Sequence, residues 1–131
     1  MILMDTCVIV WDALDPLKLS NKALTAINKA DEYNALIISD ISLWEISMLI
    51  KKGRIKIEAT PTNFINLYLQ TRNIIVQSIS AEIAELSVNF GNEINSDPAD
   101  RIIAATAIIN NAQLVTADQN LRNCSLLDTV W

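Results

Sequence analysis

The 131-residue sequence has no histidine, two glycines, three prolines and two cysteines. Without histidine the chain cannot build a Ser-His-Asp triad, a Cys-His pair, an HExxH zinc site or a His-ligated haem. Cys7 and Cys124 form no CxxC pair, which argues against a disulfide framework and a cysteine-based zinc site. The scarcity of glycine and proline excludes collagen-like and low-complexity classes. Any chemistry must therefore use carboxylates, hydroxyls, Lys, Arg or a bound ion.

The composition is that of one folded domain. Apolar residues make up 51% and charged residues 19%, and no linker or repeat divides the chain, so residues 1–131 are expected to form a single domain. The longest apolar stretch, residues 102–109, is too short to cross a bilayer, and the first residues lack the basic region of a signal peptide. Two unpaired thiols and no export signal predict a cytoplasmic protein without a membrane partner.

Short apolar runs alternate with amphipathic segments along the chain. Strands are expected at residues 2–4, 35–38, 74–76, 113–116 and 129–131, and helices at residues 21–31, 40–52, 61–69, 81–90 and 98–111. Residues 8–14 fit either a helix or a loop. The alternation predicts an α/β fold, a three-layer α/β/α sandwich around a short central parallel sheet. In such sheets the functional site lies outside the carboxyl ends of the strands.

Carboxylates interrupt this apolar pattern in four segments. Asp5 directly follows one expected strand and Asp118 stands just after another, so both should lie at the same edge of the sheet, although each could instead serve only as a helix N-cap. Glu45 falls on a helical stripe with Ile41, Trp44, Met48 and Leu49, where an unpaired glutamate would be costly. The alternatives for Glu45 are an ion pair with Arg101 or a place at the edge of the stripe.

Asp100 stands at the top of another apolar stripe, in the first turn of the helix at residues 98–111. Capping explains Asp97, which precedes a proline, but Asp100 lies inside the helix and needs another reason. Four converging acids would repel one another unless a cation joined them. Oxygen ligands without His or Cys select Mg²⁺ or Mn²⁺, with Thr6 and Thr116 placed to hold carboxylates or water.

Four ordered motifs contain these acids. They are Met4-Asp5-Thr6, Ser42-Leu43-Trp44-Glu45-Ile46 with Lys52-Gly53-Arg54-Ile55, Asp97-Pro98-Ala99-Asp100-Arg101, and Val115-Thr116-Ala117-Asp118. Together they resemble the motifs of the PIN-domain ribonucleases and, more narrowly, of the VapC toxins of type II toxin–antitoxin systems, and the resemblance spans essentially the whole chain. Close relatives often carry His where this chain has Cys7 and Asn95.

The resemblance implies a Mg²⁺- or Mn²⁺-dependent endoribonuclease toxin that hydrolyses RNA phosphodiester bonds with metal-activated water. It assigns the four acids of the site to Asp5, Glu45, Asp100 and Asp118, with Asp5 and Asp100 as the expected direct metal ligands. Thr6, Asp97 and Thr116 match residues that line such sites. The implied partners are RNA, a small antitoxin protein and a second copy of the chain. A PIN-fold module that binds RNA or protein without catalysis is the alternative.

The net charge of −5 argues against general attraction to RNA, so an RNA partner needs a local basic patch or bridging cations. Lys51, Lys52, Arg54 and Lys56 form the one basic cluster, which suits either a phosphate track or an ordinary helix C-terminus. Arg101 suits either a phosphate contact or a structural ion pair. Trp11 and Trp44 fit packing in the core or between subunits better than stacking on a base.

Two other enzyme classes fit less well. A phosphoacceptor receiver domain needs an Asp at the end of the third strand, where this chain has Gln77. A phosphohydrolase with an aspartate nucleophile usually has a second Asp two residues later, and Cys7 stands there.

Overall fold

The computed structural model describes all 131 residues, as five strands and seven α-helices that alternate along most of the chain. The strands are β1 (Ile2–Met4), β2 (Leu36–Ser39), β3 (Ile74–Gln77), β4 (Gln113–Val115) and β5 (Thr129–Val130). The helices are α1 (Thr6–Leu14), α2 (Asn21–Glu32), α3 (Asp40–Lys51), α4 (Pro61–Thr71), α5 (Ala81–Asn89), α6 (Pro98–Ile109) and α7 (Gln119–Arg122). A short 3-10 helix, Pro16–Lys18, follows α1.

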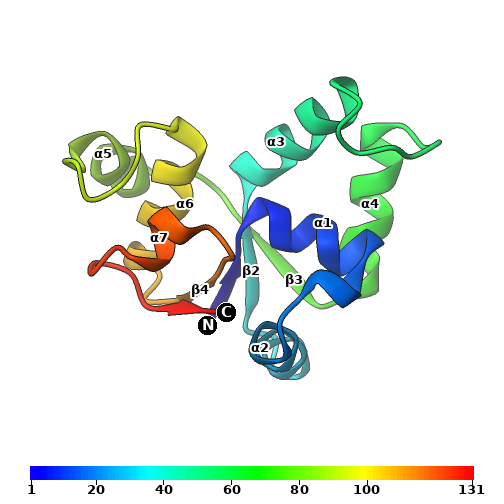
Figure 1. Cartoon of the computed structure of the whole chain (residues 1–131), viewed down its shortest axis with the longest axis horizontal. Coiled ribbons are helices and arrows are strands. Elements are labelled where there is room, and N and C mark those ends of the chain that lie inside the picture. Colours follow the sequence, from blue (N-terminus) through cyan, green and yellow to red (C-terminus); the bar gives the residue numbers. More distant parts are fainter.

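The strands form one sheet in the order β3-β2-β1-β4-β5, and every pairing is parallel. Figure 1 shows α1, α2 and α4 on one side of this sheet and α5, α6 and α7 on the other. The predicted three-layer α/β/α sandwich is therefore confirmed.

Each central strand contributes side chains to two hydrophobic cores, one on each face of the sheet, because successive side chains point to opposite faces. Ile2 and Met4 of β1 pack with α1, α2 and α4, whereas Leu3 between them packs with α5, α6 and α7. Strand β2 repeats this division. Burial on both faces explains why these strands read as continuous apolar runs rather than as alternating ones.

The helix starts follow the capping residues that the sequence offers. Side-chain oxygens of Ser20, Ser39, Thr60, Ser80 and Asp97 accept backbone N–H bonds at the starts of α2, α3, α4, α5 and α6. Beyond α3, Gly53 adopts φ +71°, the left-handed conformation expected of a residue that ends a helix. The last residue of each of the five predicted helices lies within two residues of the last residue of the observed helix.

Three local expectations needed correction or completion. Residues 8–14, left open between helix and loop, belong to α1, and the four-residue α7 was not predicted. The predicted core stripe of α3 is wrong, since the fully buried side chains on that helix are Ser42 and Ile46. Trp44 is 55% exposed, because α3 projects from the end of β2 and turns this side away from both cores.

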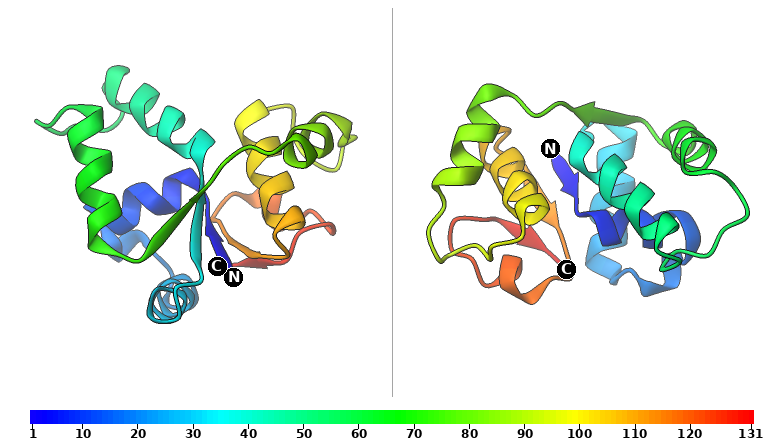
Figure 2. Two further views of the ribbon diagram at one scale, coloured as in Figure 1. Left: turned by 180° about the vertical axis from the view of Figure 1, so that it is seen from behind. Right: turned by 90° about the horizontal axis from the view of Figure 1, so that it is seen from above.

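The topology brings distant segments to one edge of the sheet. Strand β1 lies between β2 and β4, and helices α1 and α3 start at the carboxyl ends of β1 and β2. Seen from above in Figure 2, α6 lies across from α3 and α1. Every helix falls short of the length and apolar content that a membrane crossing requires.

Candidate active site

The four acids predicted to converge line one cleft at the carboxyl edge of the sheet. The cleft has a volume of about 330 Å³, and its lining residues are Asp5, Thr6, Cys7, Trp11, Glu45, Leu49, Asp100, Ala117 and Asp118. The acids come from four segments: the end of β1, the middle of α3, the first turn of α6 and the residue before α7. No basic side chain lines the cleft, and the ion pairs of the protein involve Asp12, Asp15 and Asp31 instead.

Asp5 is the deepest of the four carboxylates. Its backbone N–H extends the pairing of β1 by donating to Val115 O, and the residue is 7% exposed. Asp5 Oδ1 accepts from the backbone N–H of Thr6 at 2.8 Å, and Asp5 Oδ2 accepts from Thr116 Oγ1 at 2.7 Å. Burial raises the pKa of Asp5 in spite of these hydrogen bonds, and the charge of Asp118 adds to the effect. Asp5 therefore caps α1 and also lines the cleft.

Glu45 makes no ion pair with Arg101, contrary to one alternative. Thr6 Oγ1 donates to Glu45 Oε1 at 2.5 Å, and Ser42 Oγ lies 2.9 Å from the same Thr6 hydroxyl. Since the single hydroxyl hydrogen of Thr6 is directed to Glu45, Ser42 is the donor to Thr6. Burial raises the pKa of Glu45, and the charge of Asp5 contributes.

Asp100 is half-buried, and its Oδ2 accepts from Asn95 Nδ2 at 2.9 Å. Burial raises the pKa of Asp100 to about 6; the Asn95 hydrogen bond opposes this effect, and the charge of Asp5 strengthens it. The amide of Asn95 is itself held, since both its Nδ2 and its backbone N–H donate to Asn120 Oδ1 at 3.1 Å. Asn120 was not predicted, because it stands in the unforeseen α7.

Asp97 and Asp118 are the N-caps of α6 and α7. For Asp118, capping was the alternative to a role in the site, and the structure shows that the residue both caps a helix and lines the cleft. Asp118 Oδ1 accepts from the backbone N–H of Leu121 at 3.1 Å, and Asp97 Oδ1 accepts from that of Asp100 at 3.1 Å. Capping uses one oxygen of Asp118 and leaves the other without a hydrogen bond at the cleft. Thr116 links the two sides of the cleft, because its hydroxyl accepts from the Asp118 N–H at 3.0 Å and donates to Asp5.

Arg101, predicted to contact either a phosphate or an acid, binds the protein backbone in this structure. The guanidinium donates to four backbone carbonyls of the loop between α5 and α6, at 2.7–3.2 Å. A guanidinium has five N–H donors, so little of its capacity is left for a phosphate. The other basic residues proposed for RNA, Lys51, Lys52, Arg54 and Lys56, are all exposed around the end of α3.

Cys7 lies in the cleft but is poorly suited to act as a nucleophile. Burial raises the pKa of its thiol to about 11, and the charges of Asp5, Glu45, Asp100 and Asp118 act in the same direction. The reactive thiolate is therefore scarce near neutral pH.

The donor set fits a hard cation. All candidate ligands are oxygens, and one oxygen on each of Glu45, Asp100 and Asp118 accepts no hydrogen bond. The mutual repulsion that helps to raise the pKa values of Asp5 and Asp100 is the effect that a divalent ion reverses. No three acidic or cysteine side chains stand close enough to enclose an ion by themselves. Mg²⁺ does not require such a cage, because it keeps several water ligands.

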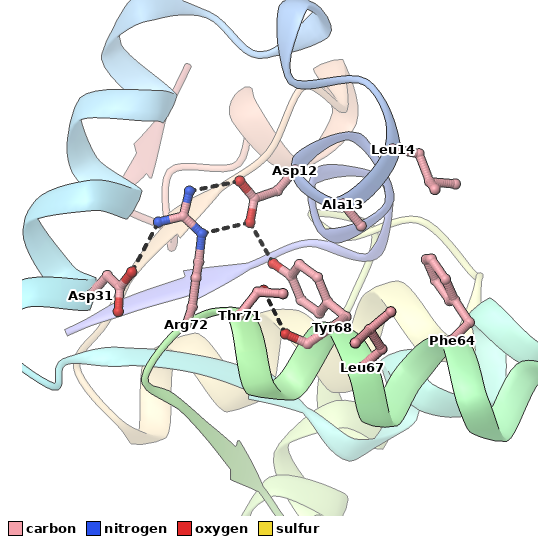
Figure 3. Close-up of a pocket in the computed structure, with 9 residues that line it drawn as sticks. All are labelled: Asp12, Ala13, Leu14, Asp31, Phe64, Leu67, Tyr68, Thr71 and Arg72. Atoms are coloured by element: carbon pink, nitrogen blue, oxygen red, sulfur yellow. Dashed lines mark hydrogen bonds and ion pairs between the residues drawn. The ribbon is translucent and has the colours of Figure 1, made fainter.

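A separate hollow of about 430 Å³ lies at the other end of α1, between α2 and α4 (Figure 3). The Arg72 guanidinium donates to both oxygens of Asp12 at 2.8 Å and to Asp31 at 3.1 Å, while Tyr68 donates to Asp12 at 2.7 Å. Burial, followed by the hydrogen bond to Asp12, raises the pKa of the Tyr68 hydroxyl. This network ties α1, α2 and α4 together, and we assign it a structural role.

Two sequence comparisons match the chain to known proteins. Residues 2–125 match the PIN domain family. The chain is 32% identical over 122 residues to ribonuclease VapC22 of Mycobacterium tuberculosis, covering 93% of this chain and 90% of that protein.

Solved structures share the fold at lower identity. VapBC2 from Rickettsia felis, bound to a promoter DNA fragment, superimposes with a TM-score of 0.74 at 20% identity, covering 98% of this chain and 97% of that one. DNA-bound VapBC from Salmonella typhimurium superimposes with a TM-score of 0.71 at 16% identity, covering 98% of this chain and 95% of that one. With its sheet order, its four acidic segments and these relatives, the chain belongs to the PIN-domain family and, within it, to the VapC ribonucleases.

Proposed function

We propose that the protein is a Mg²⁺- or Mn²⁺-dependent endoribonuclease, the toxin of a type II toxin–antitoxin pair. The observation that carries the proposal is the cleft that four carboxylates from four chain segments line without a basic side chain. Membership of the VapC ribonucleases supports RNA as the substrate. Repulsion and burial both destabilise a carboxylate cluster of this kind unless a cation joins it, and capping accounts only for Asp5 and Asp118.

The residues have distinct roles in this proposal. Asp5 and Asp100 hold the ion directly, and Glu45 and Asp118 hold it directly or through water. A bound Mg²⁺ or Mn²⁺ ion lowers the pKa of a water molecule and polarises the phosphoryl oxygen of the substrate. Thr6 and Thr116 fix the carboxylates of Glu45 and Asp5 by hydrogen bonds, so that their oxygens are oriented before the ion and substrate arrive.

Glu45 is also suited to orient the attacking water or accept its proton. It lines the cleft with one oxygen free of hydrogen bonds, and burial raises its pKa, which brings the carboxylate nearer to the pKa useful for a base at neutral pH. Cleavage in this way leaves a 3′-hydroxyl and a 5′-phosphate.

The proposed partner proteins are a small antitoxin and a second copy of the chain. The VapBC complexes that share the fold support the antitoxin. The net charge of −5 suits a basic antitoxin segment, and we propose that the pair acts in the cytoplasm, where RNA is available.

The test is a nuclease assay on total RNA and on short single-stranded oligoribonucleotides, with Mn²⁺, with Mg²⁺ and with EDTA. We expect cleavage with either ion and none with EDTA, and we expect Asp5→Asn and Asp100→Asn to abolish cleavage while the folded structure is kept. RNA binding without cleavage in the presence of both ions would favour the non-catalytic alternative. Full activity in both variants would contradict the assignment of the acids.

A further inference from the structure

A second hollow of about 600 Å³ adjoins the acidic cleft and shares Glu45 with it. It lies between α3, the start of α6 and the segment before α5. Its lining residues are Asp40, Ile41, Trp44, Glu45, Met48, Ile79, Asp97, Pro98 and Ala99. Because one wall is common to both, a polymer whose phosphate sits at the carboxylates can place a neighbouring unit in this hollow.

Trp44 is the feature of this hollow that most needs an explanation. Its side chain is 55% exposed, although its neighbours in the hollow include the apolar side chains of Ile41 and Met48. Glu45 of the acidic cleft is the next residue in the chain. A large exposed aromatic surface is unfavourable in water unless a ligand or partner covers it. Proteins that hold single-stranded RNA stack unpaired bases on such side chains.

Asp40 adds a polar requirement to the same hollow. Its Oδ2 accepts from the backbone N–H of Ile79 at 3.3 Å, whereas its buried Oδ1 has no hydrogen-bond partner. Since Asp40 lines the hollow and its Oδ2 accepts a single long hydrogen bond, this carboxylate keeps acceptor capacity for a ligand that brings a donor. Asp97 places a second carboxylate on the lining. The hollow is therefore apolar on its Trp44 side and rich in acceptors elsewhere.

We propose that this hollow is a nucleobase subsite, in which the base of a nucleotide next to the scissile phosphate stacks on Trp44. The acceptors favour a base with an exocyclic amino group, which adenine, cytosine and guanine have and uracil lacks. Trp44 and Met48 of α3 and Lys52, the C-cap of that helix, follow one another at intervals of four residues, so RNA leaving the subsite meets the basic end of the helix. The inference rests on the proposed ribonuclease function and adds a sequence preference to it.

The test is a nucleoside titration of the ¹⁵N-labelled protein, followed by NMR of the three tryptophan indole N–H groups. Cytidine and uridine are the probes, because they are uncharged and equal in ring size but differ in the group at C4, amino or oxo, and in the proton on N3. We expect the Trp44 indole to shift, with cytidine binding about tenfold more tightly than uridine, because the cytosine amino group offers two N–H donors to the carboxylates whereas uracil offers only its N3–H. The indoles of Trp11 and Trp131, assigned with Trp→Phe variants, should not move.

Two variants complete the test. Trp44→Ala should weaken cytidine binding about 5- to 100-fold while Trp44→Phe keeps most of it, and Asp40→Asn should bring the cytidine-to-uridine ratio towards one. An unmoved Trp44 indole, or equal binding of both nucleosides, would overturn the proposal. A dimer that dissociates in Trp44→Ala, with no nucleoside shift in the wild type, would show that a second copy covers the hollow, which also overturns it. The titration needs no metal and no cleavage, so its outcome is independent of the nuclease assay.

Discussion

Replacing Asp100 by asparagine should stabilise the protein in the absence of divalent ions. Burial, with a contribution from neighbouring acids, raises the pKa of Asp100 from 3.8 to about 6. A carboxyl group with a higher pKa in the folded than in the unfolded state binds protons more tightly when folded. The free energy of unfolding therefore falls as the pH rises from about 4 to about 6, and it stays lower above that range. An asparagine side chain at this position cannot ionise and avoids this loss.

The size of the effect follows from the same shift. The difference between 3.8 and about 6 corresponds to about 3 kcal/mol. Since Asp100 is only half-buried, solvent screening reduces the expected gain to about 1–2 kcal/mol. For a chain of this length, that gain raises Tm by about 3–8 °C. Calorimetry in EDTA near pH 7.5 should show the difference, and it should vanish near pH 4, where the wild-type carboxyl is protonated.

Saturating Mn²⁺ should reverse the order of stability. The wild type gains about 2.7 kcal/mol when the free ion is at 100 times its Kd, whereas Asp100→Asn loses a ligand and gains much less. Glu85→Gln is the matched control, because it makes the same chemical change on an exposed part of α5 and should stay within about 0.5 kcal/mol of the wild type in both buffers. An Asp100→Asn protein that is less stable than the wild type in EDTA, or equally stabilised by Mn²⁺, would refute the reasoning.

Four further predictions concern the rest of the molecule. Thr116→Val removes the 2.7 Å hydrogen bond to Asp5 and should weaken Mn²⁺ binding about tenfold in an EPR titration, whereas Thr116→Ser should bind Mn²⁺ as the wild type does. Equal Mn²⁺ affinities of the two variants would contradict the role of the hydroxyl. Mn²⁺ affinity should also fall as the pH drops through about 6, because protons compete for Asp100; a flat profile would argue against that ligand. Arg72→Met leaves the carboxylate of Asp12 buried without a cation and should lower the free energy of unfolding, measured by chemical denaturation, by about 3–5 kcal/mol. The control Lys18→Met, at an exposed pair 4.0 Å apart, should lower it by less than about 0.5 kcal/mol, and equal effects would contradict the structural role of Arg72. Neutralising the basic cluster at positions 51, 52, 54 and 56 should weaken RNA binding and flatten its dependence on salt, and an unchanged slope would mean that these side chains serve only the helix end.

The sequence carried enough information to predict the sheet and the position of the acids. Strands that are buried on both faces are recognisable in the sequence as short unbroken apolar runs. Because the carboxyl ends of parallel strands lie at the same edge of a sheet, the sequence alone predicted that Asp5 and Asp118 lie there together. Helical periodicity brought Asp100 to the same place. The capping residues marked the starts of five helices because their hydrogen bonds are local.

The setting of each side chain could not be predicted from the sequence. The stripe on α3 is apolar whether it faces a core or a hollow, so periodicity alone placed Trp44 inside when the helix in fact projects from the sheet. Arg101 was predicted to meet an acid or a phosphate, but it binds backbone carbonyls of a loop whose path has no sequence signature. The support of Asp100 by Asn95 and Asn120 spans 25 residues and depends on the unforeseen α7.

The central place of β1 in the sheet has a consequence for how the cell makes this protein. Strand β1 is translated before the strands that flank it, and it pairs on one side with residues 36–37 but on the other with residues 113–115. The hydroxyl that orients Asp5 belongs to Thr116, and Asp118 follows it. The nascent chain therefore cannot complete the acidic cleft until the segment that carries Asp100, Thr116 and Asp118 has been translated.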